Sequence, residues 1–122
     1  MAKYHTYGFE KLDVYQNALE LSIKIRPVIQ SFPREERYEL TSQLKRAIDS
    51  IPANLAEGSG RASSFDQAHF TNMSFSSGLE VISHLKLSHL LGYINDEQSE
   101  TLRKDLDKIL NQLNALYKHQ LS

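Results

Sequence analysis

Histidine and glutamate are the residues of this chain best suited to metal or proton chemistry, but their spacing does not match the di-iron motif of helical bundles. Di-iron sites in helical bundles use Glu-x-x-His on two helices and one further Glu on each of two others. Glu80 and His84 are four residues apart, and no second such pair exists. We therefore expect no metal and no cofactor. The histidines, which we expect to be hydrogen-bonded or solvated, are His5, His69, His84, His89 and His119.

The sequence also lacks the usual motifs for nucleophilic catalysis and phosphate binding. It has no cysteine, which excludes thiol catalysis, thiolate metal sites and disulfides. No serine stands in a Gly-x-Ser-x-Gly turn. The segment Gly58-Ser59-Gly60-Arg61 lacks the strand and the Gly-Lys pattern of a phosphate-binding loop, so it is more typical of a turn between helices. We expect no catalytic residue.

A polar stripe precedes this turn. At 100° per residue its members fall within a sector of about 80°, beside the apolar face of the helix expected there. The solvent face of that helix carries Ser42, Lys45 and Asp49. A stripe that mixes amides, hydroxyls and both signs of charge indicates contact with another protein surface. The polar stripe consists of Gln43, Arg46, Ser50, Asn54, Glu57 and Arg61.

A carboxylate on the following helix is the expected partner of this stripe. Glu80 shares a face with apolar residues such as Leu87, and a carboxylate in such surroundings needs a partner. A turn near Arg61 makes the two helices antiparallel and brings Arg46 beside Glu80. We predict an Arg46–Glu80 ion pair, buried between helices or at a subunit interface. The alternative is a solvated surface contact.

A local basic patch is a second candidate site. Acidic neighbours, Asp49 and Glu57, dilute it. Because phosphate neutralisation supplies most nucleic-acid affinity, this patch is where RNA or DNA would bind. The residues of the predicted basic patch are Lys24, Arg26, Lys45, Arg46 and Arg61.

Four amphipathic segments must position these residues. Apolar side chains recur every three or four positions in four stretches, which predicts helices and no strands. Short connections make consecutive helices antiparallel, so we predict an all-α, up-down-up-down four-helix bundle. Small residues around Gly78 in the third helix predict close packing of another backbone. The expected helices span Asp13 to Gln30, Pro33 to Gly58, Ser63 or Ser64 to about Leu91, and Asn95 to about Leu121.

The ends of these helices carry recognisable capping signals. Gly58 and Gly92 are expected to cap the second and third helices at their C-termini. Ser or Asn followed three residues later by Gln is typical of a capping box. The expected boxes are Ser64 with Gln67 and Asn95 with Gln98.

The composition is that of an ordinary globular domain. We expect one domain over residues 1–122, with residues 1–10 as an N-terminal extension. With 14 basic and 15 acidic residues the net charge is −1, which argues against a strongly basic nucleic-acid-binding protein. There is no secretory signal and no apolar run that could span a membrane. We therefore expect a cytoplasmic protein without membrane contact.

Several segments together resemble one bacterial family. These are Phe9-Glu-Lys-Leu-Asp-Val-Tyr-Gln16, Gln43-Leu-Lys-Arg-Ala47, the run from Ser50 to Arg61, and Ser77-Gly-Leu-Glu80. From about Phe9 to Tyr117 the chain is similar to the four-helix-bundle proteins encoded in 23S rRNA intervening sequences. That family includes the accessory variability proteins of diversity-generating retroelements.

The resemblance implies a four-helix protomer in a ring-shaped homopentamer, with no known enzymatic activity. It also implies nucleic-acid binding for the retroelement members, which are basic, whereas this chain has a net charge of −1. The family motif corresponds here to Gln43, Arg46, Ser50, Asn54, Glu57, Gly58, Arg61 and Glu80.

Three hypotheses follow for the function. The first is a non-catalytic oligomeric bundle with a binding or scaffold role. The second is an RNA- or DNA-binding accessory protein that uses the predicted basic patch. The third is an enzyme with a carboxylate–histidine site at Glu80 and His84, which no motif supports.

Overall fold

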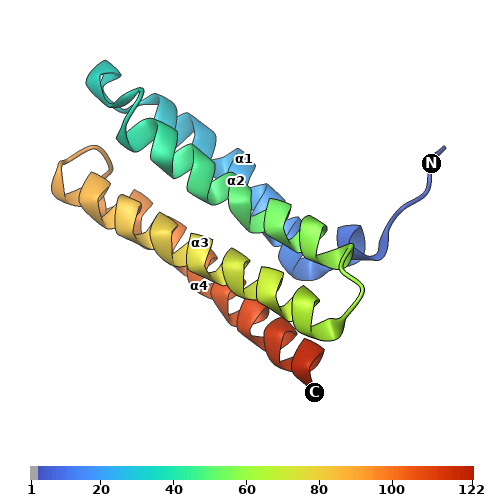
Figure 1. The fold of residues 1–122 in the computed structure, drawn as a ribbon. Helices are drawn as coiled ribbons and strands as arrows, with labels where there is room; N and C mark the ends of the chain where they lie inside the picture. Colours follow the sequence, from blue (N-terminus) through green and yellow to red (C-terminus); the bar gives the residue numbers. More distant parts are fainter. Residues whose placement is uncertain (1–2) are drawn as a thin grey trace.

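The fold is built from helices alone over the range that the structure describes. The computed structural model describes residues 3–122, and these contain no β-strand. The helices α1 (Asp13–Gln30), α2 (Leu40–Ser59), α3 (Ser64–Leu90) and α4 (Asp96–Leu121) form an antiparallel up-down-up-down bundle (Figure 1). Two 3-10 helices, η1 (Gly8–Lys11) and η2 (Arg34–Glu36), precede α1 and α2. None of these helices is long and apolar enough to cross a membrane.

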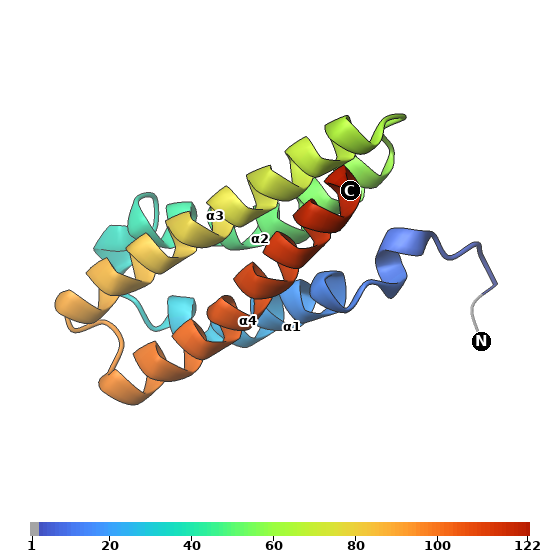
Figure 2. The ribbon, with the colours of Figure 1, turned by 90° about the horizontal axis from the view of Figure 1, so that it is seen from below.

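Each helix packs against its neighbours along the chain, and α1 packs against α4 to close the ring of four (Figures 1 and 2). Residues 3–7 project away from the bundle, and η1 connects them to α1 (Figure 2). The first two residues of the predicted N-terminal extension lie outside the described range.

The core is a single apolar cluster along the bundle axis. Every α-helix contributes side chains at the three- and four-residue spacing read from the sequence. Fully enclosed members include Ile25 of α1, Leu44 of α2, Val81 of α3 and Leu106 of α4. Burial of such side chains is the main force that holds short helices together in water.

Small residues allow α2 and α3 to approach closely. The buried Ser74 hydroxyl donates a hydrogen bond to the carbonyl oxygen of Ile51, at 2.9 Å. One turn later, Gly78 is so close to α4 that a Cβ there would lie 2.7 Å from Leu110 Cδ2. The prediction of close packing in this part of the third helix is confirmed.

The second helix begins later than predicted. A start near Pro33 was expected, but Arg34–Glu36 forms η2 and α2 starts at Leu40. Leu40 is the first side chain after Phe32 that is buried. A helix over the intervening residues would bury no apolar face, and that burial is what stabilises helices in proteins.

Two predicted capping residues are wrong. Gly58 is buried inside α2, and the helix ends beyond it, with Gly60 as the C-cap. The cap of α3 is Ser63 rather than Ser64, because Ser63 has an extended backbone that lets its hydroxyl accept the N–H of Asp66 at 3.0 Å.

The caps around the last turn are confirmed. Gly92 follows α3 with a φ of +80°, a conformation that glycine adopts without strain. Asn95 and Gln98 form the predicted capping box, in which each side chain accepts the other's backbone N–H, at 2.8 and 2.9 Å. The first helix, Asp13–Gln30, has the predicted bounds.

Candidate functional site

The polar stripe of α2 meets α3 at a small network of hydrogen bonds. Arg46 Nη2 donates to Glu80 Oε2 across the helix interface and to Gln43 Oε1 within α2 at 2.9 Å. The same Glu80 oxygen hydrogen-bonds His84 Nε2 at 3.0 Å. The predicted Arg46–Glu80 pair is therefore present, and it confirms the antiparallel register of the two helices.

This pair is not buried within one chain. The side chain of Arg46 is 58% exposed and that of Glu80 is 36% exposed. An ion pair with this much exposure contributes little to the stability of a single protomer. Within the protomer it is therefore a surface contact between helices.

Other members of the stripe bind their own helix or its C-terminal turn. Ser50 Oγ donates to the carbonyl oxygen of Ala47 at 2.7 Å, and Asn54 Nδ2 donates to that of Ser50 at 2.9 Å. Glu57 and Arg61 form an ion pair at 3.6 Å. The stripe thus runs along the whole of α2 as a partly exposed polar band.

The turn between α2 and α3 is organised around Arg61. Its guanidinium lies over the ring of Phe70, 4.5 Å from the ring centroid. Its carbonyl oxygen accepts a hydrogen bond from Gln67 Nε2 at 3.0 Å. Gly58 lies beneath Phe70, where an added Cβ would be 2.6 Å from the Phe70 Cβ. Arg61 and Gly58 therefore set how closely the ends of α2 and α3 approach.

The outward side of α3 carries large exposed apolar side chains among polar ones, some of which, such as Leu87, the sequence had already placed on the face of Glu80. Its large apolar side chains face solvent along the whole helix, from Phe65 (74% exposed) to Leu90 (84% exposed). The clue in the sequence is that α3 has apolar residues on all sides rather than in one stripe, which indicates burial on more than one side. This apolar face consists of Phe65, Met73, Leu79, Leu87, Leu90 and Leu91.

Most cations of the predicted basic patch are paired with carboxylates. Lys24 Nζ lies 2.8 Å from Asp105 and Arg26 Nη2 lies 2.7 Å from Asp49. Arg46 and Arg61 bind Glu80 and Glu57, as described above. Within residues 3–122, Lys45 alone of the five has no ion pair. The local charge is therefore largely neutralised.

Asp49 is the most strongly held of these carboxylates. Both of its oxygens accept hydrogen bonds from Arg26, and Oδ1 also accepts one from the Ser22 hydroxyl at 2.7 Å. Burial by itself would raise the pKa of Asp49. The hydrogen bonds from Arg26 and Ser22 and the charges of Arg26 and Lys45 outweigh burial, and the pKa of Asp49 falls below its usual value.

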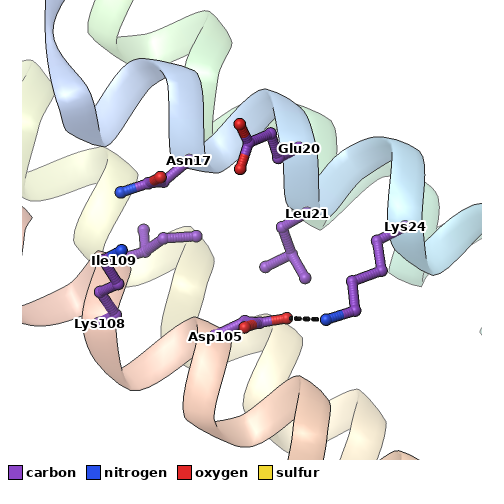
Figure 3. Close-up of a pocket in the computed structure, with 7 residues that line it drawn as sticks. All are labelled: Asn17, Glu20, Leu21, Lys24, Asp105, Lys108 and Ile109. Carbon is purple, nitrogen blue, oxygen red and sulfur yellow. Dashed lines mark hydrogen bonds and ion pairs between the residues drawn. The ribbon is translucent and has the colours of Figure 1, made fainter.

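A small cavity of about 140 Å³ lies between α1 and α4 (Figure 3). The Lys24–Asp105 pair closes one end of it, and Leu21 points into its middle. Glu20 and Lys108 also line it, so both signs of charge face the same space. It contains no group of residues arranged for catalysis.

Two of the five histidines, His84 and His89, form hydrogen bonds with carboxylates. His84 binds Glu80, and His89 Nε2 lies 2.6 Å from Asp96 Oδ1 across the last turn. No three His, Asp or Glu side chains gather into a metal-binding group among residues 3–122.

The fold and these surfaces define a class of protein, an all-α four-helix bundle whose polar α2 stripe adjoins an apolar α3 face. The chain belongs to the family of 23S rRNA-intervening sequence proteins, whose family model matches residues 10–115. This confirms the predicted resemblance to the proteins encoded in 23S rRNA intervening sequences.

One solved structure supports the same assignment. It is a crystal structure from Bacteroides thetaiotaomicron VPI-5482, described as a protein with unknown function from the S23 ribosomal protein family. Its sequence is 25% identical to this chain. The match covers 86% of this chain and 95% of the Bacteroides chain, and the TM-score is 0.79. No curated protein matches the chain. These matches establish the family and the fold, and they name no enzymatic activity.

Proposed function

We propose that this protein is a non-catalytic bundle that assembles with copies of itself and serves as a binding or scaffold protein. The observation that carries the proposal is the apolar face of α3. By contrast, α1 exposes only Ile23 among its large apolar side chains and α4 only Leu121, within the described residues. Apolar exposure concentrated on one face is typical of a protein–protein contact.

The polar stripe of α2 fits the edge of the same contact. Protein interfaces combine an apolar centre with a polar, solvent-accessible rim. Arg46 of the stripe already reaches Glu80, which lies beside the apolar face on α3. We propose that the apolar face forms the centre of the contact and that the polar stripe forms its rim.

We propose five copies in a closed ring, the number that the family resemblance implies. In a ring each copy uses two different surfaces, so the apolar face of one copy packs against another part of its neighbour. Glu80 shares this face and is paired with Arg46, which suits the role because unpaired charges are costly at the centre of an interface.

The test is the mass of the protein in solution. We expect light scattering or native mass spectrometry to find an oligomer, about five times the protomer mass of 14.0 kDa. The variant Leu90→Glu should dissociate toward the monomer, because it places an unpaired charge in the contact. Leu90 is exposed in the protomer, so the variant should keep its helical content and fold.

The control is Ile23→Glu. Ile23 is 72% exposed on α1, so the substitution has the same chemistry on a different helix. It should leave the oligomer intact. A wild-type protein that stays monomeric at micromolar concentration would refute self-assembly, and an oligomer that survives Leu90→Glu unchanged would refute the assignment of the contact to α3.

A further inference from the structure

Two arginines that the basic-patch prediction left out share a cavity. A cavity of about 390 Å³ lies beside the turn from α1 to α2, and Arg34 and Arg37 both line it. Gln30 and Thr41 add an amide and a hydroxyl to its wall, and the buried side chain of Phe32 contributes an apolar surface. No carboxylate lines it. The volume is in the range of sites for small ligands.

These arginines differ from the cations of the predicted basic patch. Among residues 3–122, neither Arg34 nor Arg37 forms an ion pair with a carboxylate, whereas Arg26 and Arg46 both do. Arg37 is positioned by a different contact, because its guanidinium lies 5.3 Å from the centroid of the Tyr38 ring. Two guanidinium groups are thus available to a ligand at one site.

The neighbouring acidic residues do not occupy this cavity. Glu36 is bound elsewhere, because the Tyr93 hydroxyl of the loop between α3 and α4 donates to its Oε2 at 2.8 Å. Glu35 and Glu39 are not part of the lining. The positive charge of the cavity is therefore not neutralised from its own walls.

We propose that this cavity binds a small phosphate monoester. Arg34 and Arg37 would hold the phosphate, Thr41 and Gln30 would donate further hydrogen bonds, and Phe32 would contact the organic part. Guanidinium groups recognise phosphate oxygens with paired N–H donors. Two arginines match the charge of close to −2 on a terminal phosphate at pH 7.

The proposal commits to a small ligand rather than to RNA. A phosphodiester carries a single charge, and an RNA site needs several cations spaced along a backbone. Here two arginines line one open, concave site, while most cations of the predicted basic patch are paired. The proposal does not depend on the assembly of the protein.

The experiment is a calorimetric or NMR titration of the full chain with adenosine 5′-monophosphate, with adenosine as the uncharged probe. We expect the monophosphate to bind and adenosine not to bind. Because a charge-assisted hydrogen bond is worth about 1.5–3 kcal/mol, Arg34→Gln and Arg37→Gln should each weaken binding by roughly tenfold or more. The control Arg103→Gln removes an exposed arginine of α4 that lies outside the cavity and should leave binding unchanged.

Several outcomes would overturn the proposal. These are no binding of the monophosphate at millimolar concentration, equally tight binding of adenosine, and binding by the two cavity variants as tight as by the wild type. A short RNA that binds where the monophosphate does not would also overturn it in favour of a nucleic-acid site. The amide resonances that shift on titration must lie around residues 30–41.

Discussion

The role of each charged side chain on this protein depends mainly on the oppositely charged residue with which it pairs. The Arg46–Glu80 pair could be predicted, because the position of one turn sets which residues of two antiparallel helices lie opposite each other. The Arg26–Asp49 pair could not. Asp49 belongs to the solvent side of α2 by its position in the helix, and only the rotation of α1 against α2 brings Arg26 within 2.7 Å of it.

The Arg26–Asp49 pair predicts a pH dependence of stability. The pKa of Asp49 is lowered in the folded state. Its contribution is therefore present above the unfolded pKa of about 3.9 and is lost as the pH falls through the folded value. Because Asp49 is 48% exposed, we expect Asp49→Asn to reduce the free energy of unfolding at pH 7 by at most about 1 kcal/mol.

Denaturant unfolding of the wild type and Asp49→Asn, from pH 7 down to the acid limit of folding, measures this effect. The difference between the two proteins should shrink as the pH falls. Asp107→Asn serves as the control, since Asp107 pairs with Arg103 on its own helix. A difference between the wild type and Asp49→Asn that stays constant with pH would contradict the assigned role of Asp49.

At the scale of elements, the packing of the end of α2 depends on Gly58, which has no Cβ. Gly58 was expected to terminate the helix, which is a common use of glycine. Instead it lies inside the helix against Phe70 of α3, where the absence of a Cβ permits close contact. Sequence alone did not distinguish the two roles, because a glycine near the end of an apolar repeat is compatible with both.

We predict that Gly58→Ala destabilises the protein despite the better helix propensity of alanine. The new Cβ would lie 2.6 Å from the Phe70 Cβ, which cannot move without its backbone, and overpacking of this kind costs about 1–3 kcal/mol. Thermal and chemical unfolding would measure the change. Gly60→Ala is the matched control, because its Cβ would meet only an ordinary contact at 3.5 Å, and it should have a much smaller effect.

The elements themselves were largely predictable. Helices α1 and α4 follow regular apolar repeats, and the Asn95–Gln98 capping box marks the start of α4. The start of α2 was not predictable in the same way, because Pro33 and two glutamates are as favourable for a 3-10 turn as for an α-helix. The start of α2 is decided by the first side chain that reaches the core, which is Leu40.

At the scale of the whole molecule, the near-neutral charge bears on nucleic-acid binding. The net charge is −1, and four of the five cations of the predicted basic patch bind carboxylates. We expect weak binding of a fluorescent single-stranded RNA in anisotropy titrations, with little dependence on salt. Several phosphate contacts would instead give a log–log slope of about −0.7 per contact. Such a slope would support the accessory-protein hypothesis.

The four-helix bundle and the family could both be predicted from one sequence, whereas the exposure of the α3 apolar face and the cavity at Arg34 and Arg37 could not. The apolar repeats specify which side of each helix is buried within the protomer. They do not tell whether a second apolar side, as on α3, is exposed or covered. The cavity at Arg34 and Arg37 depends on a 3-10 turn, whose geometry has no repeat to read.

The order in which the helices pack also bears on how the chain folds. Three of the four helix–helix contacts join segments adjacent in sequence, and only that between α1 and α4 joins distant ones. Such local connectivity allows rapid folding, because few long loops must close before favourable contacts form. The contact between α1 and α4, where Lys24 and Asp105 pair at the surface, is thus the one helix–helix contact that requires the two ends of the bundle sequence to meet (Figure 3).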